Sequence, residues 1–297
     1  MIISCVLPFL IAASFGAFAP PLSRRVRPGL AIWMLSAGGL ALTICVVVAL
    51  GVVAALGLGQ LAPLARLGHW SPHRLGLNAP FQAWSTWTAV VLVVLATARA
   101  ASSSWSQGRR LRAAWSTSRA APAGLVVLAD DEPYAYAVPG WPGRIVVSRG
   151  LLQSLDHSGR RALLAHEQTH LGEHHDLHHL AVAVATAVNP LLLRLPAALH
   201  LACERQADEV AAQTVGHRGT VARAITTAVG PHLQTLAWAA SGADVPVRVA
   251  ALLSPPRDNR MLSIALLIAT IMAVAMSAAS VLWLGHDLRS LVIVARY

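Results

Sequence analysis

The chain has 297 residues, of which 56% are hydrophobic and only 12% are charged, and its mean hydropathy is +0.58. These values exclude a soluble globular domain of average composition and indicate a membrane protein. The formal net charge of +10 comes from arginine alone, and no basic stripe interleaved with aromatic residues accompanies it, so direct nucleic-acid binding is not expected.

Long apolar runs predict four transmembrane helices, at residues 2–19, 30–58, 81–98 and 261–285. The arginines of residues 24–27 follow the first run and do not precede it, which favours a membrane span over the alternative of a cleaved signal peptide. Residues 1–98 are therefore expected to hold three spans, residues 99–260 a separate domain, and residues 286–297 a short tail after the fourth span.

The distribution of arginine predicts the orientation in the membrane. Nineteen of the 23 arginines lie in residues 24–27 and 99–260, and only four lie elsewhere. Because positive charge is retained on the cytoplasmic side, the domain of residues 99–260 is expected to be cytoplasmic and the N-terminus outside. The expected location is the cytoplasmic membrane, with the lipid bilayer as a partner of a multi-pass protein.

Short β-branched runs in this domain predict a small sheet. Residues 124–129 and 144–148 are bounded by turn residues, residues 134–138 alternate aromatic and small side chains, and the link 139–143 must turn because it holds two prolines and two glycines. The last two runs should form a hairpin. Its edge would accept a peptide substrate as an added strand, or the hairpin would only cover the core.

The segment 163–171 is expected to be a helix that carries an HExxH motif. Residues four apart share a helix face, so His166 and His170 can bind one metal ion while Glu167 lies beside them. A catalytic zinc ion takes three protein ligands and keeps one position for water, and the glutamate serves as the general base. Chance gives only about 0.01 such motifs in a chain of this composition, although a helix with surface histidines is the alternative.

The third ligand is expected on a later helix. In the extended motif a glycine stands at 173 and a ligand at 176, but here these positions hold Glu173 and Asp176, so the register fails. Glu204 and Asp208 are four residues apart in an apolar helix, so Glu204 can complete the site and Asp208 can orient a ligand histidine. Cys203 is a less favoured ligand, and a surface acidic pair is the alternative interpretation.

Four further histidines lie between residues 174 and 179. They suggest a second metal site, but a solvated helix end is favoured, with a role of His174 in metal loading left open. The apolar run that follows, residues 180–193, is short for a span. We expect a helix that packs on the core or dips into the membrane face.

In combination, several segments resemble the membrane-embedded gluzincin metallopeptidases, which comprise the HtpX and CAAX prenyl protease type and the BlaR/MecR antirepressor type. The similar segments are AYAVPG (135–140), RIVVSRGLL (144–152), HEQTH (166–170), ERQAD (204–208) and RVAALL (248–253). The resemblance implies zinc ligands at His166, His170 and Glu204, a catalytic base at Glu167 and an orienting acid at Asp208.

The order of three spans, a cytoplasmic protease and one span is similar to the BlaR/MecR type. The antibiotic-sensing members carry a large extracellular domain after the last span, whereas only 12 residues follow Gly285 here. Direct antibiotic sensing is therefore not expected.

The expected fold is a mainly α membrane protein, with four transmembrane helices and a cytoplasmic α+β zincin-like metallopeptidase domain that contains a small hairpin or sheet. The expected function is zinc-dependent hydrolysis of protein or peptide substrates, with one Zn²⁺ per chain and a cytoplasmic repressor as a possible substrate. Arg248, His232 and Tyr136 are candidates for transition-state or substrate contacts. The alternatives are HtpX-like quality control and a non-catalytic zinc scaffold, whereas spans without internal charge argue against a transporter.

Overall fold

The structure is a computed structural model that describes every residue except 79–80, 119–123, 141–142, 238–243, 255–259 and 297. The long helical segments are α1 (Ile2–Arg25), α2 (Pro28–Trp33), the π-helical turn η1 (Met34–Gly38), α3 (Gly39–Leu58), α6 (Ala83–Ser118) and α13 (Arg260–Arg296). Two short helices, α4 (Ala62–Gly68) and α5 (Pro72–Asn78), connect α3 to α6.

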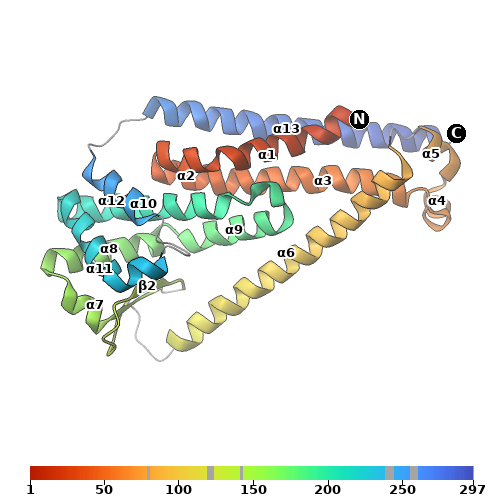
Figure 1. Cartoon of the computed structure of the whole chain (residues 1–297). Coiled ribbons are helices and arrows are strands. Elements are labelled where there is room, and N and C mark those ends of the chain that lie inside the picture. The colour runs from red at the N-terminus through yellow and green to blue at the C-terminus, as the bar shows by residue number, and fades with distance from the viewer. Residues whose placement is uncertain (79–80, 119–123, 141–142, 238–243, 255–259, 297) are drawn as a thin grey trace.

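The remaining elements form the compact end of the molecule. They are β1 (Gly124–Leu128), β2 (Ala135–Val138), β3 (Arg144–Ser148), α7 (Arg149–Ser154), α8 (His157–Gly172), α9 (His175–Val188), the 3-10 turn η2 (Pro190–Leu192), α10 (Leu195–Val215), α11 (Arg218–Ala237) and α12 (Val245–Leu253). Figure 1 shows the sheet with α7, α8, α11 and α12 at one end, and both termini with α4 and α5 at the other. The expected fold class, mainly α with a small sheet, is confirmed.

Within the described residues, four segments are long and apolar enough to cross a membrane: Ile2–Arg25, Pro28–Leu58, Trp84–Arg109 and Arg260–Arg296. Each predicted span overlaps one of these segments, and the expectation of four candidate membrane helices is confirmed. Figure 1 shows α1, α3 and α13 side by side, while α6 runs obliquely away from them towards the sheet.

Several helices extend beyond the predicted boundaries, and α6 continues to Ser118, past the expected start of the separate domain at residue 99. The first helix continues past residue 19 to Arg25, through Pro20 and Pro21, and the Ser23 hydroxyl donates to the Pro20 carbonyl at 2.9 Å. The expected tail at residues 286–297 is helical as far as Arg296. It is held in place because the Ser71 N–H donates to the Ala295 carbonyl at 2.9 Å.

The strands among the described residues form a three-stranded sheet in the order β1-β3-β2. Strands β2 and β3 pair antiparallel, with Tyr136 opposite Val146, so the predicted hairpin is confirmed. Strand β1 pairs parallel with β3. In this part of the chain β2 is an edge strand, and its outer backbone groups face no other strand.

The largest core cluster joins the first membrane helices to the α9–α10 hairpin. Leu192, Leu195 and Leu199 are fully buried against residues of α1 and α3. A side chain at Gly16, in the middle of α1, would bring its Cβ within 2.2 Å of the Leu191 carbonyl oxygen, so only glycine permits this approach. The apolar run after the metal helix therefore packs on the core, and its tip lies beside the middle of the first span.

Candidate metal centre

Helix α8 presents the motif histidines because its start is capped and one of its faces packs on α10. The Asp156 carboxylate accepts a hydrogen bond from the Gly159 N–H at 2.6 Å and caps the helix start. Ala162 and Ala165 pack against Ala211 and Ala212 of α10. These small side chains let the two helices approach closely, so residues of α8 and α10 meet across the contact.

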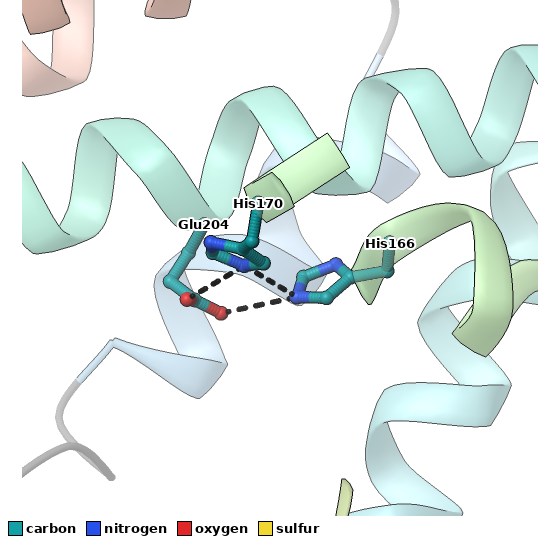
Figure 2. A group of neighbouring side chains, drawn as sticks. All are labelled: His166, His170 and Glu204. Carbon is teal, nitrogen blue, oxygen red and sulfur yellow. Dashed lines mark hydrogen bonds and ion pairs between the residues drawn. The ribbon is translucent and has the colours of Figure 1, made fainter. Parts of the chain in front are cut away.

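Figure 2 shows His166 and His170 pointing towards the Glu204 carboxylate. The His166 Nε2 atom lies 3.5 Å from Glu204 Oε2, and His170 Nε2 lies 3.4 Å from Oε1. The two Nε2 atoms are 3.2 Å apart. Within the described residues this is the group whose donor atoms are arranged as metal ligands would be.

These separations fit a tetrahedral zinc ion. With ligand distances of about 2.1 Å, the donor atoms of such a site lie about 3.4 Å apart. The two Nε2 atoms are 3.2 Å apart, within 0.2 Å of that edge length, and each lies 3.4 or 3.5 Å from a different oxygen of the Glu204 carboxylate. Two imidazoles and one carboxylate are also the donor set of known catalytic zinc sites, which keep a fourth position for water.

The Glu167 carboxyl lies between the metal centre and the edge strand. It is 8% exposed and accepts a hydrogen bond from the Ala137 backbone of β2. Burial raises the pKa of this carboxyl above its usual value, while His166 opposes the shift. A carboxylate with a raised pKa binds a proton more readily, as a general base requires.

An arginine holds the acidic residues of α10 in place. Arg248 of α12 contacts both Asp208 oxygens, at 2.8 and 2.7 Å, and its Nη1 lies 2.7 Å from Glu204 Oε2. Asp208 Oδ1 in turn lies 3.1 Å from His166 Nδ1. Arg248, a candidate for a transition-state or substrate contact, is 13% exposed and pairs with both carboxylates, and it also lines a cavity that includes Glu167 and Ala135 of β2.

Opposite charges stabilise the ionised forms of this network. Burial lowers the pKa of His166, but hydrogen bonds to Asp208 and Glu204 outweigh it and raise the pKa to about 9. Burial raises the pKa of Glu204, yet His166 and Arg248 hold it well below its usual value. Burial lowers the pKa of His170 to about 3, so this imidazole is neutral.

The other predicted residues lie in different places. Tyr136 is 43% exposed on β2, and its ring stacks near Tyr134 with 6.2 Å between centroids. The His232 side chain lies outside the described part of the structure. Cys203 is fully buried in the core, and burial raises the pKa of its thiol to about 12, so it does not suit a metal ligand.

Two residues beside the centre were not assigned roles from the sequence. His175 was expected at a solvated helix end, but it is 2% exposed, and its Nδ1 lies 2.8 Å from His170 Nδ1. Its Nε2 lies 3.2 Å from Gln206 Oε1. The chain reverses at His174, which has a positive φ of 52°, and this turn points His175 back towards α8. No spacing rule along one helix predicts such a contact.

Two cavities flank the centre, and both are lined by Ala135, His166, Glu167 and Glu204. One has a volume of about 370 Å³ and a largely apolar wall from α7, α8 and α11, which includes Leu151, Leu155, Leu163, Val221 and Ile225. The other, of about 380 Å³, is lined by Tyr136, Pro139 and the histidines of α8 and α9. Together they extend along β2 on both sides of Glu167.

Comparison with known proteins finds a similarity over about a third of the chain. Residues 100–201 match the model of Peptidase family M48, whose members are metallopeptidases. This segment is 102 of the 297 residues and contains His166, Glu167 and His170, but it ends before Glu204. Searches of curated proteins and of solved structures gave no match. The family match supports a membrane-type metallopeptidase and does not separate the HtpX type from the BlaR/MecR type.

Proposed function

We propose that the protein is a zinc-dependent membrane endopeptidase that hydrolyses peptide bonds of protein substrates. The observation that carries this proposal is the position of Glu167, which lies beside a two-histidine, one-glutamate cluster and is hydrogen-bonded to the edge strand β2. A purely structural metal site has no need for a buried carboxyl group at this place.

The roles of the residues follow from their positions. His166, His170 and Glu204 would hold the zinc ion, which would supply polarisation of a scissile carbonyl and a lowered pKa of a water molecule. Glu167 accepts the proton of the attacking water and donates it to the leaving amine. Asp208 accepts the Nδ1 proton of His166, so this imidazole keeps its Nε2 lone pair for the metal.

The substrate binds as an added strand along β2, which is an edge strand in the described part of the sheet. In this arrangement backbone hydrogen bonds supply most of the affinity, and alternate side chains point towards the two cavities beside Glu167. The apolar cavity accepts a large hydrophobic side chain close to the scissile bond.

Removal of the metal tests the enzymatic proposal. Full-length protein in detergent micelles is expected to cleave an unfolded protein substrate, to lose this activity with a zinc chelator, and to regain it when stoichiometric zinc is added. Cleavage that persists after metal content has fallen to zero, as measured by atomic absorption, would contradict the metallopeptidase mechanism.

The biological role that we favour is site-specific cleavage of a cytoplasmic protein such as a repressor. Three spans, a catalytic unit and a fourth span follow one another along the chain, and the arginine-rich unit is expected on the cytoplasmic side. The alternative is quality control of membrane proteins. The two roles differ in whether one or many proteins are bound, which the trapping experiment in the Discussion measures.

The charge network predicts a pH dependence of zinc binding. The pKa of His166 is raised to about 9 in the metal-free protein, so below pH 9 zinc must displace its proton. Since His170 and Glu204 are already deprotonated at neutral pH, binding should release about one proton, and the apparent affinity should rise about tenfold per pH unit until the pKa is reached.

Calorimetric titration in buffers with different ionisation enthalpies measures the number of protons released at pH 7. An affinity that does not change between pH 6.5 and 8.5 would contradict the predicted charge state of His166.

A further inference from the structure

The imidazole of His170 contacts a second imidazole through Nδ1, the ring nitrogen that faces away from the candidate metal site. The Nδ1 atom of a zinc-ligating histidine commonly donates to a carboxylate, a backbone carbonyl or water. Here the Nδ1 of His170 lies 2.8 Å from the Nδ1 of a second imidazole, His175, at the start of α9. The two rings are nearly perpendicular to each other, with an interplanar angle of 81°.

The second imidazole is held by an amide of another helix. Gln206 Oε1 lies 3.2 Å from His175 Nε2, and Gln206 is two residues after Glu204 on α10. The other end of this amide lies against α2, where a Cβ on Gly29 would be 3.3 Å from Gln206 Nε2. The amide therefore lies between α2 and the candidate metal centre, and its Oε1 atom is the one in contact with His175.

The positions of the hydrogens follow from donor and acceptor chemistry. An amide oxygen can only accept, so His175 must carry its proton on Nε2. A neutral His175 then presents an Nδ1 lone pair, which accepts the Nδ1–H of His170. The Nε2 lone pair of His170 is left to face His166 and Glu204, as a metal ligand requires.

We propose that Gln206 is a positioning residue that acts through His175 to fix the tautomer and orientation of His170 for zinc binding. This proposal rests on the zinc site of the proposed function. His166 is oriented by a charged pair, Asp208 and Arg248. His170 is instead oriented by two neutral side chains, His175 and Gln206, which we call the relay. The two ligand histidines therefore reach the same tautomer through different partners.

Zinc affinity of the full-length protein in detergent micelles tests the relay, by competition with a chromophoric chelator. Gln206→Met keeps the length of the side chain but removes the acceptor, and zinc affinity is expected to fall about 10- to 100-fold. Gln206→Glu keeps an acceptor oxygen at the same reach and is expected to bind zinc at least as tightly as the wild type. Gln213→Met, on the exposed face of the same helix, is the matched control and should change affinity by less than about threefold.

The comparison with His175→Ala separates the relay from general packing. If Gln206 acts through His175, adding Gln206→Met to His175→Ala causes no further loss, because the relay is already broken. Gln206→Asn shortens the side chain by one methylene and so moves the amide oxygen away from His175. If Gln206→Met does not fold, Gln206→Asn takes its place in this comparison.

Three results would overturn the proposal. Wild-type affinity in Gln206→Met and Gln206→Asn would exclude a role in zinc binding, and equal losses in Gln206→Met and Gln206→Glu, or additive losses with His175→Ala, would indicate packing alone. A wild-type protein that does not bind zinc would instead overturn the proposed function, together with the relay that depends on it.

Discussion

Glu167→Gln is expected to lower kcat by about 10²- to 10⁴-fold, the range that a positioned general base contributes, while the protein still binds zinc with wild-type stoichiometry. The amide has nearly the same shape as the carboxyl group but cannot accept a proton from water. Because Glu167 is not a member of the His166, His170 and Glu204 cluster, its loss should leave the metal affinity largely unchanged.

Initial rates of proteolysis and metal content of the same preparation measure both quantities. Glu173→Gln is a matched control, since Glu173 is exposed at the end of the same helix and its substitution should not alter kcat. Turnover at the wild-type rate in Glu167→Gln would remove the base assignment.

The same variant serves as a substrate trap. Glu167→Gln expressed in the native membrane should retain bound substrate, which mass spectrometry identifies against the wild type. Enrichment of one cytoplasmic DNA-binding protein is the result expected for regulated, site-specific cleavage. A broad set of damaged membrane proteins would mean that the quality-control role is the correct one.

Glu204→Ala is expected to lower zinc affinity by more than about 100-fold. Loss of a residue that only hydrogen-bonds to a metal ligand costs up to about 100-fold, and loss of a ligand should cost more. The carboxylate supplies one of three donors, and it also compensates the charge of the metal. Proteolysis should fall in parallel at zinc concentrations that saturate the wild type, and it should partly return when excess zinc is added.

Glu209→Ala provides the control because Glu209 lies on the same helix but pairs with Arg218, away from the cluster. Chelator competition gives the affinities of both variants. If Glu204→Ala bound zinc normally, the third ligand would have to come from the histidines of α9, since Cys203 is buried as a neutral thiol.

The sequence by itself determined those features that depend on spacing along one element. Apolar run length predicted the four spans, and the 3.6-residue period placed His166 and His170 on one face of α8. Alternation and turn residues predicted the β2–β3 hairpin. Each of these features depends on local backbone geometry, which residues close in sequence determine regardless of the rest of the chain.

Glu204 and Asp208 were expected beside the motif histidines, but other contacts between distant residues became known only from the tertiary structure. His175 contacts His170 because the chain reverses at His174, and Gln206 reaches His175 across 31 positions of sequence. Arg248 was a candidate for a transition-state or substrate contact, and only the packing of α12 on α10 showed that it also pairs with Asp208 and Glu204. Contacts between helices depend on the shapes of all packed side chains at once, so no periodicity within a single helix determines them.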